Sequence, residues 1–337
     1  MCDGRLPRRF AVTVLLLAVS AVFQAGLCAA VHLEDTTDVA QLEVPGVEGV
    51  NATHAYLSTT VDKLSRRIDR FFGEERIYQE ASGTYVQVRG SLIYGRGGEF
   101  DFIGRFRGKV DLPQLEEKVH LVIEGDDSRD SVEAFNRITP GIETVDPLRD
   151  SDISAALQFV IREKERWSLS LRPGVKLSTP IESFLRLRFR RAQPLGKIWL
   201  SRGTVEAGFY SVRGWRNEWQ LDLERALSEK DFFRASTTVL WREEDPGNQF
   251  LGQSFLVTHL IDRRQSIAYE AGARAETRPH PRDTSYFSGI RYRRDLHRGW
   301  LFLELKPQLV FARENSFKAD PALVLTLETL FGAEYID

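Results

Sequence analysis

The six histidines are the side chains of this 337-residue chain best suited to acid–base chemistry. His120 and His259 lie in segments of alternating polarity, and His280 lies beside prolines. None stands next to a Ser-Gly turn or in a His-x-x-x-His metal pair. The glycines of 95–98 have the spacing of a turn rather than of a phosphate-binding loop. The sequence therefore predicts no catalytic residue, no metal site and no cofactor.

Rows of charged residues are a second feature with chemical potential. Over residues 183–190, Leu185, Leu187 and Phe189 alternate with Arg186, Arg188 and Arg190. Alternation with a period of two places the apolar residues on one face of a β-strand and the charges on the other. Such rows attract and orient polar or charged solutes, but they break no bonds.

The same alternation recurs over most of the chain without helical segments between. It predicts an all-β structure of about fourteen antiparallel strands, with twelve or sixteen as alternatives. The predicted ranges are 83–94, 99–110, 117–125, 152–162, 166–177, 183–191, 197–210, 214–225, 231–243, 250–261, 265–277, 284–294, 300–312 and 321–331. The alternation is blurred in 152–162 and 250–261.

The N-terminus predicts export. Three arginines precede an apolar run over 10–22, and small residues at 28–30 suit signal-peptide cleavage, which makes 1–30 a signal peptide. A membrane anchor and a lipoprotein cleavage before Cys28 are the alternatives. Both cysteines, Cys2 and Cys28, lie in this segment, so we expect no disulfide in the exported chain. The net charge of −2 argues against a nucleic-acid binder.

Export combined with strands of about ten residues favours a transmembrane β-barrel over residues 80–331. After residue 30 no stretch of 18 consecutive apolar residues exists, so any membrane span must be built from strands. Even strand numbers are usual in bacterial barrels, and short turns at one end with longer loops at the other, here 126–151, are typical of them. An exported β-sandwich that never meets lipid is the alternative.

In a barrel, the energy of solvation assigns the faces. A single Arg on the lipid face near the bilayer midplane costs about 2–4 kcal/mol, so the charged rows must face the lumen. The lumen-lining candidates are Arg105, Arg107, Lys109, Arg186, Arg188, Arg190, Glu218, Asp222, Glu224, Glu270, Arg274, Glu276, Arg291, Arg293, Glu304 and Lys306.

Residues 55–73 have a helical period instead. The apolar positions recur every three or four residues and form one stripe: Leu57, Val61, Leu64, Ile68, Phe71 and Phe72. We expect Asp62, Lys63, Arg66, Arg67, Asp69 and Arg70 on the opposite face. The helix follows a flexible periplasmic leader at 31–54. Three roles are open: packing on the periplasmic rim, plugging the lumen, or binding a periplasmic partner.

Residues 80–331 resemble the outer-membrane β-barrel proteins of Gram-negative bacteria as an architectural class. The segment 64–73, LSRRIDRFFG, looks like the N-terminal region of uncharacterised proteobacterial exported proteins. The resemblance implies an outer-membrane location, contact with lipid and lipopolysaccharide, and insertion by the barrel-assembly machinery. Barrels of this class usually end in an aromatic residue, whereas here a short tail, 332–337, follows Phe331.

These expectations favour a pore or binding channel for small polar or charged solutes. The alternative is a sealed structural or envelope-interaction barrel that acts through its helix or its outer loops. A barrel hydrolase is a third idea, for which the sequence offers no motif.

Overall fold

The computed structural model describes residues 61, 63–69, 71–72, 84–96, 98, 100–111, 119–127, 152–164, 166–196 and 198–332. The predicted signal peptide, the 31–54 leader, Leu57, Gly73, most of the 126–151 loop and residues 333–337 lie outside this set. The side chains of Asp62 and Arg70 are also outside it.

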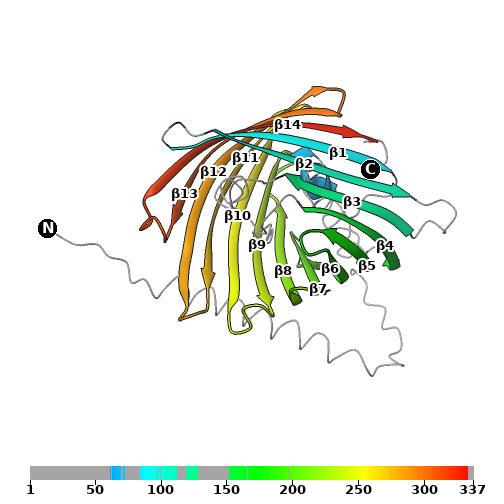
Figure 1. Cartoon of the computed structure of the whole chain (residues 1–337). Coiled ribbons are helices and arrows are strands. Elements are labelled where there is room, and N and C mark those ends of the chain that lie inside the picture. The colour runs from blue at the N-terminus through cyan, green and yellow to red at the C-terminus, as the bar shows by residue number, and fades with distance from the viewer. Residues whose placement is uncertain are drawn as a thin grey trace, which may run out of the picture.

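Fourteen antiparallel strands form a closed barrel (Figure 1), which confirms the predicted fold. They are β1 (Tyr85–Tyr94), β2 (Phe100–Asp111), β3 (Val119–Asp127), β4 (Asp152–Lys164), β5 (Trp167–Leu177), β6 (Glu182–Leu195), β7 (Trp199–Tyr210), β8 (Gly214–Ala226), β9 (Asp231–Arg242), β10 (Gln249–Leu260), β11 (Gln265–Glu276), β12 (Arg282–His297), β13 (Leu301–Ala312) and β14 (Ala319–Phe331). Each strand pairs with its neighbours in sequence, and β1 pairs with β14 to close the ring. The closing register runs from Val86 opposite Phe331 to Tyr94 opposite Leu323.

The two faces of the sheet differ sharply in character. One face carries exposed apolar side chains, such as Val88, Phe102 and Leu187, which are 45 %, 68 % and 42 % exposed. Because side chains alternate along a strand, the residues between them fall on the other face, which is rich in buried polar groups such as Glu328 and Arg293. The outer face is therefore apolar and the inner face polar.

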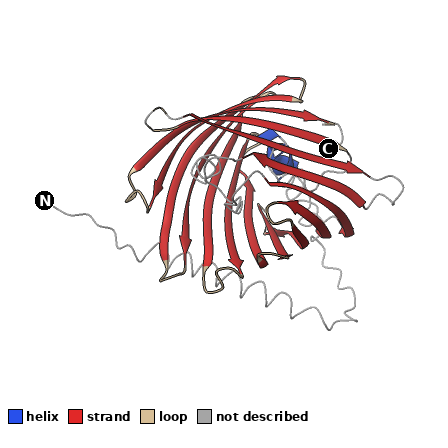
Figure 2. Cartoon of the chain, in the orientation of Figure 1, coloured by secondary structure: helices blue, strands red, loops and turns tan. Residues whose placement is uncertain are grey.

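A helix lies against the inner face. Residues 63–69 are helical, as are the flanking residues 61, 71 and 72 (blue in Figure 2). Its buried cluster includes Leu200 on β7, Phe232 on β9 and Leu260 on β10, and Phe71 contacts Phe302 on β13. Only a helix inside the ring reaches inward-facing side chains over so wide an arc. Within the described residues, no helix is long and apolar enough to cross a bilayer.

The helix sits at the barrel end where even-numbered strands finish and odd-numbered strands begin; we call this the helix end and the opposite one the far mouth. At the helix end, the described connections after β4, β6, β8, β10 and β12 have two to four residues. At the far mouth, those after β5, β7, β9, β11 and β13 have three to six. The predicted asymmetry in loop length is thus small among the described connections.

Aromatic side chains pair on the outer face near the strand ends. Trp300 stacks on Phe331 with ring centroids 6.3 Å apart, and Tyr94 meets Phe100 at 4.8 Å. Phe331 is 57 % exposed and is the last residue of β14. Amphipathic rings at such positions suit the interface between a bilayer and water.

Candidate functional site

The inner face of the barrel carries all sixteen charged residues that the sequence singles out. The ladder registers link them from strand to strand: Arg105 lies opposite Arg89, Arg186 opposite Arg172, and Arg293 opposite Glu304. By these registers the sixteen positions lie on the same face of the sheet as the buried Glu328 and alternate with the exposed apolar residues. The exposure of these side chains and their ion-pair partners bear on whether a solute could pass along them.

A buried ion network ties the helix to the barrel wall. Arg234 on β9 donates to Asp69 at 2.6 Å and, through Nε, to Glu224 on β8 at 3.1 Å. Glu224 also accepts from Ser65 at 3.1 Å and forms an ion pair with Arg202 at 3.4 Å. The Asp69 and Glu224 side chains are fully buried. Two acids and two bases are therefore neutralised together at the helix end, and we call this group the helix latch.

Asp69 therefore corrects one expectation. The sequence places it on the polar face of the helix, away from Leu64 and Ile68, but it is buried on the same side as they are. Ser65 is buried there too. The side of the helix that meets the barrel is thus mixed, because the wall opposite it offers Arg234 as a partner for the carboxylate.

Apolar packing completes the seat of the helix. Val61, Leu64, Ile68 and Phe72 are at most 7 % exposed and pack against Leu200, Phe232, Leu260 and Ala268 of the wall. The guanidinium of Arg291 covers the Phe72 ring at 4.4 Å from its centroid. Burial of each such side chain contributes about 1.5–3 kcal/mol. Four of the six predicted partner-binding positions are thus buried within the chain itself, and Phe71 packs beside them.

A second buried network lies where the ring closes. Glu328 on β14 accepts from Arg293 on β12 at 2.8 Å and from Arg89 on β1 at 2.6 Å. Arg293 also pairs with Glu304 at 3.5 Å. Both Glu328 and Arg293 are almost completely buried. This network joins the first strand to the last around the buried Glu328 and Arg293, while Arg89 is partly exposed, and it stabilises the closed ring.

The inner surface of β5–β7 has a different character. Arg172, Arg186, Arg188 and Arg190 stand there in adjacent rows, and we call them the basic wall. Arg172 pairs with Glu124 at 3.7 Å, Arg186 with Glu206 at 3.8 Å, and Arg107 also with Glu124. These ion-paired side chains are 13–29 % exposed, whereas Asp69 and Glu224 of the helix latch are fully buried. Water therefore reaches this part of the inner face.

Gly174 gives the basic wall its geometry. A Cβ at this position would lie 2.4 Å from the Phe184 ring, so the ring of Phe184 occupies the space that a side chain would fill. The guanidinium of Arg186 in turn lies over that ring at 4.5 Å. A close backbone approach at a glycine thus orients an aromatic ring, and the ring supports an arginine.

Most of the other predicted residues have charged or polar partners on the same strand or on a strand one or two positions away. Lys306 forms an ion pair with Glu270, and Glu276 accepts from Arg282 at 2.7 Å. Glu218 pairs with Arg216 at 3.1 Å. Asp222 accepts from Ser236 at 2.6 Å, and Lys109 is 3 % exposed. The acidic residues therefore lie within a web of local pairs.

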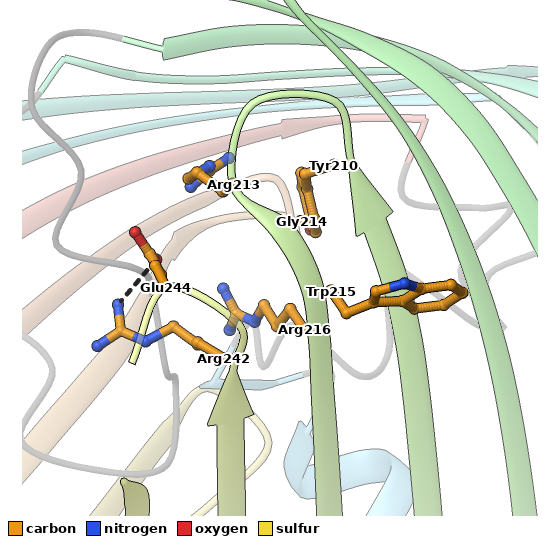
Figure 3. Close-up of a pocket in the computed structure, with 7 residues that line it drawn as sticks. All are labelled: Tyr210, Arg213, Gly214, Trp215, Arg216, Arg242 and Glu244. Carbon is orange, nitrogen blue, oxygen red and sulfur yellow. Dashed lines mark ion pairs between the residues drawn. The ribbon is translucent and has the colours of Figure 1, made fainter. Parts of the chain in front are cut away.

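A small hollow opens at the far mouth (Figure 3). It has an empty volume of about 200 Å³ and is lined by Tyr210, Arg213, Gly214, Trp215, Arg216, Arg242 and Glu244. Arg242 pairs with Glu244 at 3.6 Å, and Arg213 is bound to Glu182. The ring of Trp215 points away from the arginines. The hollow is too small to hold more than a few water molecules or one small ion.

Several residues of the inner face escape the sequence analysis. Ser65 and Asp69 lie in the helix, and Arg202, Glu206 and Glu328 lie in strands where apolar neighbours dilute the alternation. A signal for the helix seat does exist in the sequence, because the blurred strand β10 carries Leu256 and Leu260 on its inner face. Among the described residues, no group of three His, Cys, Asp or Glu side chains could hold a metal ion.

No family model matches the chain, and no curated protein matches it. Solved structures with a similar fold are barrels. The "Bacterial polysaccharide outer membrane secretin" is 11 % identical, with 74 % of this chain and 99 % of that chain covered and a TM-score of 0.45. Pseudomonas putida OprB at high pH is 8 % identical, with 77 % and 97 % covered and a TM-score of 0.47. The "KdgM porin" is 6 % identical, with 73 % and 99 % covered and a TM-score of 0.38.

Proposed function

We propose that the chain is an outer-membrane β-barrel that passes small polar or charged solutes. The apolar outer face supports a lipid environment, since a water-soluble barrel would gain nothing from exposing Phe102 and Leu187. Aromatic pairs near the strand ends suit the headgroup region. Lipid and lipopolysaccharide are then the partners of the outer face, and Phe331 at the end of β14 is the candidate signal for the insertion machinery.

The observation that carries the pore proposal is the accessible basic wall. Residues of a sealed, side-chain-filled lumen would be closed to water throughout, as Glu328 and Asp69 are. Instead the Arg186 side chain is 22 % exposed and that of Glu206 is 29 % exposed, although both face inward. This exposure, which Arg89 at the seam shares, supports a lumen that holds water.

Single-channel recording tests this function. The chain without residues 1–30, refolded and inserted into a planar bilayer, should give stable ohmic steps in KCl. Removing residues 55–72 should enlarge the step, because the helix fills part of the helix end. A correctly folded barrel that stays silent in both forms contradicts a pore.

The second candidate is a sealed barrel that acts through its helix, and the helix latch favours it. Eight adjacent strands, β6–β13, contribute to the latch or to the apolar seat of the helix. A periplasmic partner could use Leu64 and Ile68 only after the helix had left this seat. The same recordings separate the two candidates, because a sealed barrel conducts only when the helix is deleted.

A further inference from the structure

The helix divides the inner face into two unequal parts. Its contacts run from Ala192 at the end of β6 to Phe302 on β13. That arc includes the acidic Glu224, which the helix latch neutralises. The buried side of the helix is thus turned toward this arc. A solute at the helix end would therefore pass on the other side of the helix, which faces β1–β5.

The side of the helix turned away from its seat is basic. Lys63, Arg66 and Arg67 are exposed, whereas Val61, Leu64 and Ile68 are buried. At 100° per residue, 63, 66 and 67 lie on the opposite side of the helix from 61, 64 and 68. Since the buried side contacts β6–β13, the basic side looks across the lumen toward β1–β5.

The opposing wall of that space is basic as well. It holds Arg172, Arg186, Arg188 and Arg190, with Glu124 and Glu206 as the acids in ion-pair contact. Arg105, Arg107 and Lys109 on β2 also face inward by register, so positive charge is in excess on this wall. The helix thus covers part of the acidic side of the lumen and adds cations to the side left open.

We infer that the passage beside the helix selects anions, and that the basic side of the helix forms one of its walls. This inference rests on the proposed pore function and names its substrate class: small organic anions with carboxylate or phosphate groups. Guanidinium groups bind both groups through paired N–H donors. A row of arginines at successive inward positions offers such a solute several equivalent sites along its path.

Reversal potentials in a KCl gradient provide the test. The chain without residues 1–30 should favour chloride over potassium. Arg186→Gln with Arg188→Gln should lower the chloride-to-potassium permeability ratio about threefold to fivefold, the worth of a unit charge a few ångströms from an ion in water. Lys63→Gln with Arg67→Gln should lower it in the same direction.

The matched control is Arg191→Gln with Arg225→Gln. Both arginines face outward by register, near the same end of the barrel as Arg190. Their replacement removes two positive charges but should leave the permeability ratio unchanged. A fall equal to that of the inner pair would mean that selectivity reflects overall charge, and would overturn the inference.

A solute probe completes the test. Citrate or inorganic phosphate added to one side should reduce the KCl current, while glucose at the same concentration should not; the stronger blocker identifies the preferred anionic group. A conducting barrel that favours potassium, or that ignores both anions, overturns the inference and leaves the pore intact. Absence of conductance overturns the proposed pore and the inference with it.

Discussion

The substitution Asp69→Asn tests how much the helix latch stabilises the docked helix. Asn keeps the size of Asp69 but removes the charge that faces Arg234 at 2.6 Å in a fully buried position. Removal of one partner from a buried ion pair costs about 3–5 kcal/mol. Arg234 is 10 % exposed and keeps Glu224, so we expect the lower end, about 3 kcal/mol. That value corresponds to a shift of about 10²-fold toward the undocked helix.

Limited trypsin digestion measures this shift, because the helix contains Lys63, Arg66 and Arg67 and must unwind to be cleaved. When opening is fast relative to cleavage, the rate follows the undocked population. We therefore expect cleavage at 66–67 to accelerate about 10²-fold, with mass spectrometry reporting the new N-terminus. Lys63→Gln is the control: its side chain is exposed, and its loss should leave cleavage at 66–67 unchanged. If Asp69→Asn is cleaved at 66–67 about as fast as the wild type, the Asp69–Arg234 ion pair does not stabilise the docked helix, and the reasoning is refuted.

Two further predictions concern the strands. Gly174→Ala brings a Cβ to 2.4 Å from Phe184, so the folded state should lose about 1–3 kcal/mol in urea unfolding, whereas Gly203→Ala, with open space around it, should not. Folding into vesicles should also depend on the depth of an outward charge. Leu187→Arg, in the middle of β6, should cost about 2–4 kcal/mol, and Leu195→Arg, at the end of β6, about 0–1 kcal/mol. Equal costs for the two leucines would contradict a bilayer around the barrel.

The strands could be predicted because the middle of their outer face is mostly apolar. On β6 the outward Leu185, Leu187 and Phe189 are each followed by an inward arginine, and the period of two is plain. On β10 it is blurred because Leu256 and Leu260 face inward to receive the helix. The local pattern therefore weakens where a tertiary contact supplies an apolar environment inside the barrel.

Partners that lie far apart in the sequence could not be predicted. Asp69 and Arg234 are 165 residues apart in sequence, and Arg89 and Glu328 are 239 apart. The alternation along the strands assigns Arg234 and Arg186 to the same inner face. Arg234 is nevertheless enclosed by the helix, whereas Arg186 is accessible to water. That distinction depends on where the helix docks, and the inward leucines of β10 are the one indication of this in the strand pattern that we identify.

The seam between β1 and β14 has a consequence for the order of assembly. Its ladder joins Arg89 to Glu328 and Ser91 to Thr326, so it cannot exist until the last strand has been made. Until then both edge strands present unpaired backbone groups, a template for pairing with other chains. A chain that stops before β14 would keep the helix seat on β6–β13 but lack its closure. We expect such a truncated product to aggregate or to be degraded, whereas the intact chain hides both edges from other chains in a single closing event.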